Sequence, residues 1–593
     1  MDKRQATYYE FDAYRLYPFE RLLLRDGKAV PLRPKAFDTL LALVRHSGQL
    51  LSKDKLMNLI WQGSIVEEGN LTQNIFLIRK LLGESPFDHQ YIVTIPNEGY
   101  RFVADVREVV GTNLHRDLPA NARPAGVANR IGSIAVLPLK TFGGDGVDEH
   151  LGTGIADVLI TKLSYVKQLV VRPTTAILKY RDASHSPLAA GRELGVEAVL
   201  DGTVQRVGDR IRVNVQLLRL SDAKILWADK FDEEFTNIFA VQDNISEQVA
   251  RALSLELSGT EREQLNKSQT ESIEAYRLYI KGRYCWDKRT EGGLKKGIEY
   301  AEQIIRLDPN YVAAYVGLAD SYSFLGEYLH LDPNEAFPKA RAAAVKALAI
   351  DPTLAEPHAS LAEVLLFHDW DWKGAEREYK LAVEINPNYA SAHHWYAWFL
   401  MMQGRFDEAY ARIKQAQRVD PSSLALNTSL GLPFYFRQDY DRAIEQYRQT
   451  IDIDPDYNHA HYYLGAALAH KGALAEALAE LHTYRRLLRA GEYVQQVEAL
   501  LGYVLAVSGR EAEALKVVDE LQAQSTRRYV SPYCTAIVYA GLGDVEQSLA
   551  ELERAFRERA SWMVFIKVDP WFKNLRGAPR FDELVRGVAL DPQ

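Results

Sequence analysis

Side chains able to bind a nucleic acid gather between residues 52 and 101 of this 593-residue sequence. Asn and Gln can each form two hydrogen bonds to adenine, whereas Arg and Lys suit guanine or phosphate. Hydroxyl groups can reach phosphate oxygens, and an apolar side chain can contact the methyl group of thymine. The predicted DNA-contacting set is Ser52, Lys53, Asn70, Thr72, Gln73, Asn74, Leu77, Arg79, Lys80, Thr94, Asn97 and Arg101.

Residues that could bind a metal or attack a substrate lack the spacing that such chemistry needs. His393 and His394 are adjacent, and His459 and His461 are two apart, whereas side chains on one helix face recur every three or four residues. The sequence contains no HExxH, CxxC or GxSxG motif. These histidines fall early in the predicted repeat helices, where polar residues of the groove are expected, so we predict no metal site and no catalytic residue.

Two further features are weak signals of chemistry. The glycine-rich run at 143–146 lacks the Lys-Ser/Thr of a P-loop and the spacing of a dinucleotide fingerprint, so we interpret it as a surface loop. Cys285 and Cys534 are the only cysteines, and they lie far apart in predicted helices. We expect packed, inert thiols and a reducing compartment. The sequence therefore predicts neither an enzyme nor a cofactor.

A helical stripe positions most of the DNA-contacting set. Leu71, Ile75, Ile78 and Leu82 are four, three and four residues apart, which predicts one buried helix face ending at Gly83. With that face buried, we expect the remaining residues to point partly or wholly outward. These are Thr72, Gln73, Asn74, Phe76, Leu77, Arg79 and Lys80.

The flanking sequence predicts the rest of a small α+β domain over residues 5–106. Alternating strands with a turn at Asp26-Gly27 come first, and a helix opens at Pro34. A second helix follows Ser52, a predicted N-cap. The segment YIVTIPNEGYRFV alternates around Asn97-Glu98-Gly99, which predicts a hairpin. Strands, three helices and a terminal hairpin together predict a winged helix.

The segments LRPKAFDTLLALVRHSGQLLSKDKLMNLIW, LTQNIFLIRKLLG and IVTIPNEGYRF resemble the effector domain of OmpR/PhoB-type transcription regulators. The resemblance implies that the third helix enters the DNA major groove and that the hairpin wing reaches the minor groove. The sequence departs from the family at Leu77, where a basic residue is common, and at Pro96-Asn97, where the wing often has an arginine. Residues 1–106 hold 14 Lys/Arg and 13 Asp/Glu, a net charge of +1 that is low for a DNA-binding domain.

Residues 107–258 are expected to form a flexible linker and an α/β domain. The linker is predicted over 107–130, where the sequence is polar and contains Pro119 and Pro124. Strand and helix patterns then alternate over 131–258, with a hairpin turning at Gly208-Asp209. The segments IAVLPL, GTGIADVLITKLS and ELGVEAVLDGTVQRVGDRIRVNVQLL resemble the TolB amino-terminal-like domain. That resemblance implies no chemistry for particular residues.

The C-terminal half repeats with a period of about 34 residues. Proline recurs twelve residues after the small residue of five cycles, as in Ala443 and Pro455. This pattern resembles the tetratricopeptide (TPR) repeat, a helical hairpin that stacks into a solenoid with a concave binding surface. We predict about eight repeats over 270–560 and a cap over 561–593. The small residues are Gly297, Ala340, Ala375, Ala409, Ala443, Ala477, Ala514 and Ser548.

The fourth repeat is rich in aromatic residues and contains an uncharged run at 385–404. The run is in phase with the repeats and holds polar residues, so we interpret it as a buried repeat helix rather than a membrane span. The aromatic residues are expected to be mainly inter-helix core, with an anchor for a partner as the alternative. They are Tyr389, Trp395, Tyr396, Trp398 and Phe399.

The sequence as a whole predicts a multidomain protein: a winged helix-turn-helix, an α/β middle domain and an all-α TPR superhelical solenoid. Its net charge of −8 excludes polyanion binding by bulk charge alone. We expect a cytoplasmic one-component transcriptional regulator that binds double-stranded DNA, without membrane association. A protein or peptide in the TPR groove, RNA polymerase and a second copy of the chain are the other candidate partners. The alternative is a non-enzymatic TPR scaffold whose winged helix mediates protein contacts.

Overall fold

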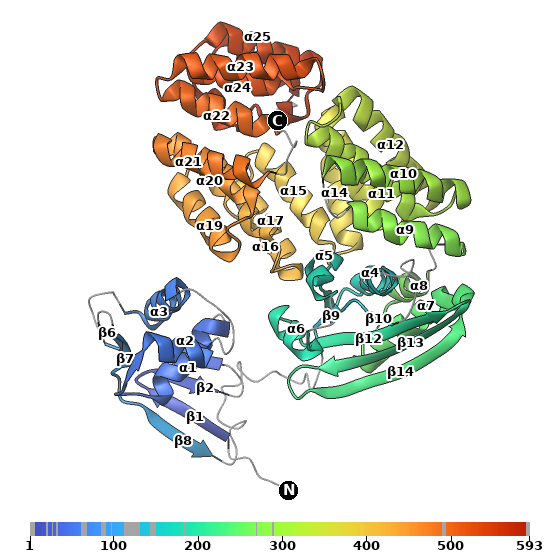
Figure 1. Cartoon of the computed structure of the whole chain (residues 1–593), viewed down its shortest axis with the longest axis vertical. Coiled ribbons are helices and arrows are strands. Elements are labelled where there is room, and N and C mark those ends of the chain that lie inside the picture. The colour runs from blue at the N-terminus through green and yellow to red at the C-terminus, as the bar shows by residue number, and fades with distance from the viewer. Residues whose placement is uncertain are drawn as a thin grey trace. The chain divides into compact units, whose positions relative to one another are not determined.

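A computed structural model describes the chain over residues 6–18, 22–25, 28–30, 32, 34–60, 68–84, 90–95, 98–111, 131–142, 150–181, 185–255, 257–267, 270–286, 290–488 and 494–588. The chain forms two compact units, residues 1–129 and residues 130–593, and each is described by itself (Figure 1). No helix in these ranges combines the length and apolarity needed to cross a membrane.

The first unit contains a five-stranded antiparallel sheet in the order β4-β3-β2-β1-β8. Its strands are β1 (Ala6–Phe11), β2 (Tyr14–Tyr17), β3 (Leu22–Arg25), β4 (Lys28–Val30) and β8 (Arg107–Gly111). Strand β8 pairs with β1, so residues 107–111 belong to this sheet and the prediction that the linker begins at 107 is wrong. The remainder of the predicted linker, like the turn at Asp26-Gly27, lies outside the described residues.

Three helices and a small sheet complete the winged helix that the sequence predicts. The helices are α1 (Pro34–Arg45), α2 (Lys53–Ile60) and α3 (Glu68–Leu82), and the sheet has the order β5 (Leu50–Ser52), β7 (Gly99–Phe102), β6 (Ile92–Ile95). Ser52 Oγ accepts a hydrogen bond from the Lys55 amide at 3.2 Å, which confirms the predicted N-cap of α2. The stripe from Leu71 to Leu82 is buried, and Gly83 ends α3 in a left-handed conformation with φ +76°.

The second unit begins with a mixed sheet in the order β11-β9-β12-β13-β14, with β10 beside β12. Helices α4 and α7 pack against it (Figure 1). The antiparallel hairpin β12–β13 turns at Gly208, as predicted. The elements are β9 (Ser133–Val136), β10 (Lys140–Phe142), α4 (Leu151–Ser164), β11 (Val170–Val171), α5 (Thr174–Ile177), α6 (Pro187–Glu193), β12 (Ala198–Val207), β13 (Arg210–Arg219), β14 (Lys224–Glu234), α7 (Ile238–Ala252) and α8 (Gly259–Asn266). The glycine run at 143–146 lies outside the described residues.

Eight helix pairs follow in the described part of the chain, and the small residue of each predicted cycle is buried in the second helix of its pair. In the fifth pair the first helix is divided into α17 and α18. The pairs comprise α9 (Ile273–Trp286), α10 (Glu291–Leu307), α11 (Val312–Glu327), α12 (Pro333–Ile350), α13 (Ala355–Val364), α14 (Trp372–Ile385), α15 (Ala390–Met402), α16 (Phe406–Val419), α17 (Leu424–Ser429), α18 (Leu432–Phe436), α19 (Tyr440–Ile453), α20 (Asn458–Lys471), α21 (Leu474–Leu487), α22 (Gln495–Val507), α23 (Glu511–Ser525), α24 (Pro532–Leu542) and α25 (Val545–Arg557).

The recurring prolines carry a repeated hydrogen bond. In five successive repeats the proline carbonyl lies within hydrogen-bond distance of the side chain six residues later, in the next helix. His358, His393 and His461 make this contact through Nε2 at 2.9–3.0 Å, and Tyr315 and Asn427 make it through their own donors at 3.2 Å. Of the four histidines that the sequence offered as ligand candidates, His393 and His461 therefore make this contact at the junction between repeats.

The solenoid closes on itself at the end of α11. The last carbonyls of a helix lack intrahelical partners. Here the last two carbonyls of α11 and the two that follow it accept hydrogen bonds from distant segments of the chain. Gln495 and Gln496 donate to the carbonyls of Leu329 and Tyr328. The donors to the carbonyls of Gly326 and Glu327 are Ser561 and Trp562 of η5 (Ser561–Phe565).

The cap also reaches back to the third repeat. It consists of η5, η6 (Pro570–Leu575) and α26 (Pro579–Val588). Helix α26 packs on α25, and the Trp372 indole donates to the Val588 carbonyl at 2.6 Å. The cap therefore covers the end of the repeat array and also ties that end to the middle of the array.

The α/β domain packs directly on the solenoid. The Arg172 guanidinium donates to the carbonyls of Arg418 and Val419 at the C-terminus of α16, at 2.7 and 2.9 Å. A cation suits that helix end because its carbonyls carry partial negative charge. Tyr165 donates to Glu356 at 2.6 Å, and Asn388 donates to the carbonyl of Ser164. The middle domain and the solenoid thus form one unit.

Candidate functional site

The exposed side of α3 is the first candidate site. Thr72, Gln73 and Lys80 are exposed there, and Leu77 is half-buried. Phe76 is 57% exposed, an unusual position for a large aromatic ring. The helix therefore offers two polar side chains, one cation and an apolar centre to a partner.

Asn74 does not belong to this exposed side, so the prediction that it points outward is wrong. Its side chain is 9% exposed, and Nδ2 donates to Thr39 Oγ1 of α1 at 3.2 Å. Asn74 stands three residues after Leu71 and four before Ile78, which places it beside the buried stripe. It joins α3 to α1.

Arg79 is also engaged within the fold. Its Nη2 donates to the Ile92 carbonyl at 2.8 Å and to Thr94 Oγ1 at 2.9 Å. Its Nε lies 3.9 Å from the buried Glu84 carboxylate, which accepts from the amides of Tyr91 and Ile92. Arg79 therefore links α3 to the β6–β7 hairpin, and the Thr94 hydroxyl, a predicted phosphate contact, accepts a hydrogen bond from it.

The other predicted DNA contacts remain predictions. Ser52 is exposed at the N-terminus of α2, while Lys53 and Arg101 are half-buried. The side chains of Asn70 and Asn97 lie outside the described residues. Ser52 ends β5, Lys53 begins α2, and Arg101 lies on β7 of the hairpin.

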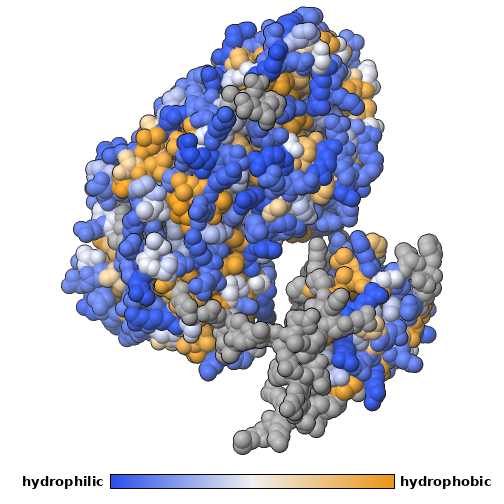
Figure 2. All heavy atoms as spheres, turned by 180° about the vertical axis from the view of Figure 1, so that it is seen from behind, coloured by the Kyte–Doolittle hydropathy of each residue, from blue (hydrophilic) through white to orange (hydrophobic). Residues whose placement is uncertain are grey.

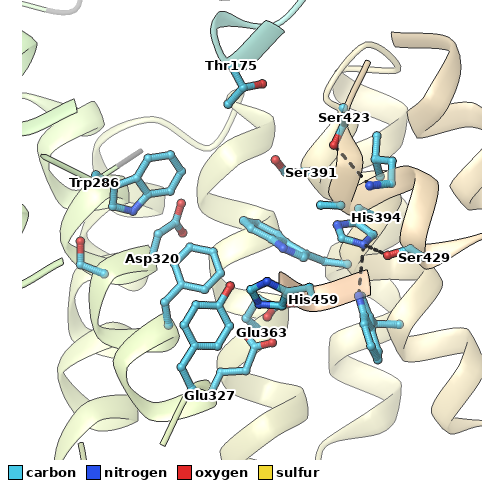
Figure 3. A pocket seen from close by; sticks show the side chains of 18 of the residues that line it. Thr175, Trp286, Asp320, Glu327, Glu363, Ser391, His394, Ser423, Ser429 and His459 are labelled. Carbon is cyan, nitrogen blue, oxygen red and sulfur yellow. Dashed lines mark hydrogen bonds between the residues drawn. The ribbon is translucent and has the colours of Figure 1, made fainter. Parts of the chain in front are cut away.

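The second candidate site is a cavity of about 1410 Å³ inside the second unit. The first helices of successive repeats line it, together with residues of the α/β domain such as Thr175 and residues of the cap such as Trp562. Figure 3 shows Asp320 near Trp286 on one side, His394 with Ser429 on the other, and Glu327 and Glu363 lower in the view. On the outer face seen in Figure 2, hydrophilic residues predominate and hydrophobic ones form small groups.

The aromatic residues of the fourth repeat divide between core and cavity. Tyr396 and Phe399 are buried in the solenoid core and do not line the cavity. Tyr389, Trp395 and Trp398 do line it. The Trp398 indole donates to His394 Nε2 at 3.2 Å, and the same nitrogen lies 2.8 Å from Ser429 Oγ.

Burial dominates the electrostatics of the cavity wall. It raises the pKa of Asp569 to about 7, and it raises the pKa of Asp420 as well. Within the described ranges no three metal-binding side chains come together. At Asp420 and Asp569 the wall therefore makes negative charge costly to hold.

Comparison with known proteins extends these observations. Residues 27–102 match the family model of the transcriptional regulatory protein C-terminal domain, and residues 129–248 match the second domain of HilA/YgeH-like transcriptional regulators. Residues 366–428 and 431–472 match TPR models. The transcriptional regulator HilA of Salmonella typhimurium is 22% identical over 95% of both chains.

The chain is homologous to bacterial transcriptional regulators. It carries an OmpR/PhoB-type DNA-binding domain and a TPR region, and its homologues include HilA, CadC and CutR. The likeness of the middle domain to TolB stays a prediction.

Two further relatives match only part of this chain. The activator CadC of Escherichia coli is 37% identical over 14% of this chain and 16% of its own length. The solved DNA-binding domain of CadC is 32% identical over 17% of this chain and 97% of that domain, with a TM-score of 0.16. Putative adenylate cyclase 3 of Rhizobium meliloti is 31% identical over 32% of each chain.

Proposed function

We propose that this chain is a one-component transcriptional regulator that acts in the cytoplasm without a catalytic step. It binds duplex DNA by placing the exposed side of α3 in the major groove and the β6–β7 hairpin beside it. The solenoid receives the signal as a protein partner or effector in its cavity. At a promoter, RNA polymerase and a second copy of this chain are the further partners that we propose.

The arrangement of α3 supports this proposal most directly. One side of the helix is buried, the other presents Gln73 and Lys80, and Arg79 fixes the angle between helix and wing. Gln73 suits adenine and Lys80 suits guanine or phosphate. The low net charge of the domain means that few phosphate contacts are available, so binding should depend only modestly on salt.

Genome-wide DNA pull-down with the full-length protein tests the proposal. The wild type and Arg107→Ala, which removes an exposed cation from the other sheet, should enrich the same set of fragments. The double variant Gln73→Ala/Lys80→Ala should lose that enrichment. Absence of reproducible enrichment at low salt, or equal enrichment by the double variant, would contradict DNA reading by α3.

A further inference from the structure

Phe76 is the only exposed aromatic residue among those that the structure describes. Every other described Phe, Tyr or Trp side chain is buried or half-buried, whereas Phe76 is 57% exposed. Contact between water and so large an apolar ring is unfavourable, and burial of the ring against a partner would be stabilising. The position of Phe76 in the middle of α3 therefore indicates a contact outside the fold.

The exposed neighbours of Phe76 on α3 are polar. Phe76 stands three residues after Gln73 and four before Lys80, so these three side chains follow one another along the exposed side of the helix. Leu77, the apolar member of the predicted DNA-contacting set, is half-buried. The structure thus makes Phe76, rather than Leu77, the more accessible apolar side chain of α3.

The major groove of DNA offers a phenyl ring one suitable partner. Adenine, guanine and cytosine present hydrogen-bond donors and acceptors there, whereas thymine also presents a C5-methyl group. A ring placed over a polar base edge removes water from it and returns no hydrogen bond, which is costly. A ring placed against the methyl group buries apolar surface on both partners. A phenyl ring in this groove therefore discriminates thymine from the other bases.

The spacing along α3 determines how far apart two base contacts fall. Gln73 suits adenine. Three residues advance an α-helix by about 4.5 Å, and successive base pairs are about 3.4 Å apart. The bases contacted by Gln73 and Phe76 should therefore lie within about two base pairs of each other.

We propose that Phe76 determines specificity by contacting the C5-methyl group of one thymine in the major groove, next to the adenine bound by Gln73. Such a contact conveys sequence information without a cation, which suits a domain of low net charge. The inference rests on the proposed function, because it requires α3 to enter the major groove.

Uracil substitution in the DNA tests the methyl contact. Selection from random duplexes with the full-length protein first identifies the preferred site. Each thymine of that site is then replaced by uracil, which lacks only the methyl group, and affinity is measured by fluorescence anisotropy. One such replacement near the adenine should weaken binding about fourfold, the value of burying one methyl group. At that position 5-methylcytosine should bind more tightly than cytosine, because it restores the methyl group.

A protein variant assigns the methyl contact to Phe76. Phe76→Ala should bind the thymine and uracil duplexes equally at that position, and it should keep the wild-type response at the other thymines. A purely structural role of Phe76 would instead weaken binding of both duplexes and leave their ratio unchanged. Leu59→Ala is the matched control, because it removes an apolar side chain of α2 that is 43% exposed, and it should keep the wild-type ratio. Circular dichroism establishes that each variant is folded.

Three results would overturn the inference while the proposed function stands. In the first, a site is selected but no uracil near the adenine weakens binding. In the second, Phe76→Ala keeps the wild-type ratio of thymine to uracil affinity at every position. In the third, Leu59→Ala loses that ratio as fully as Phe76→Ala does. Selection of no preferred sequence would instead refute the proposed function, and the inference with it.

Discussion

Two adjacent basic residues of α3 should respond differently to removal. Lys80 is exposed, and no hydrogen bond or ion pair engages it within the described part of the chain. Arg79 is mostly buried and donates to two acceptors in the wing. We therefore expect Lys80→Ala to change the electrostatics of DNA binding and Arg79→Ala to change the stability of the domain.

The magnitude for Lys80→Ala follows from counterion release. Each phosphate contact adds about 0.9 to the slope of log affinity against log salt. If Lys80 makes one such contact, its removal lowers the slope by about 0.9, and the affinity deficit of the variant shrinks about threefold between roughly 50 and 200 mM salt.

The magnitude for Arg79→Ala follows from its hydrogen bonds. A hydrogen bond to a charged group contributes about 1.5–3 kcal/mol. Loss of both bonds, together with the partner of the buried Glu84, should destabilise the contact between α3 and the hairpin by about 3 kcal/mol. The salt slope of the folded protein should change little.

Fluorescence anisotropy of a labelled random-sequence duplex, measured with full-length protein over a range of salt, reports the slope. Hydrogen exchange of peptides from α3 and from the β6–β7 hairpin reports the stability. Arg107→Ala is the matched control because it removes an exposed cation from β8. An equal fall in slope for both α3 variants, with unchanged exchange in the hairpin, would refute the link between Arg79 and the hairpin.

Three further predictions concern the second unit. Gly431→Ala should lower the melting temperature by overpacking worth about 1–3 kcal/mol, because a Cβ would lie 2.4 Å from the Tyr447 ring; an unchanged melting temperature contradicts this. Burial lowers the pKa of His393 to about 4, so its contribution to stability is complete above about pH 6.5 and is lost as the pH falls to 4. His393→Asn keeps a hydrogen-bond donor, as Asn427 does in the next repeat. Between about pH 6.5 and 4 its free energy of unfolding, measured in urea, should fall by up to about 3 kcal/mol less than that of the wild type. Parallel curves of unfolding free energy against pH for the two proteins would exclude this role of His393. Thiol titration of native protein should modify the half-buried Cys285 before Cys534, because burial raises the pKa of Cys534; equal rates contradict this.

Periodic features were the part of this structure that the sequence could predict. The spacing of Leu71, Ile75, Ile78 and Leu82 specifies a helix face without any knowledge of neighbouring elements, and that face is buried. The 34-residue period likewise places a small residue in the second helix of every pair, because close packing of two helices requires it. Local spacing therefore sufficed for the helices and their buried sides.

Local sequence patterns could not predict which side chains from distant segments contact one another. Asn74 meets Thr39 from a helix 35 positions earlier, and Arg79 meets the hairpin 13 to 15 positions later. A helical wheel reports the angle of a side chain but not what lies beside it. Closure of the solenoid through Gln495 joins residues 166 positions apart, and repeat spacing alone describes an open array.

The position of the α/β domain affects how the signal can be tested. Tyr165 is buried among residues of the second and third repeats, and Thr175 lines the cavity. Truncation near residue 258 would therefore expose an apolar surface and remove most of the cavity at once, so loss of response would not distinguish sensing from misfolding.

A ligand shifts an equilibrium only by its differential affinity for two states. Filling the cavity of the intact protein with a ligand, while following DNA affinity, measures that difference directly. Residues 130–258 lie between the DNA-binding domain and the repeats in sequence, and they supply part of the cavity wall. Any coupling between the cavity and the DNA-binding domain therefore has a continuous covalent route through residues 130–258.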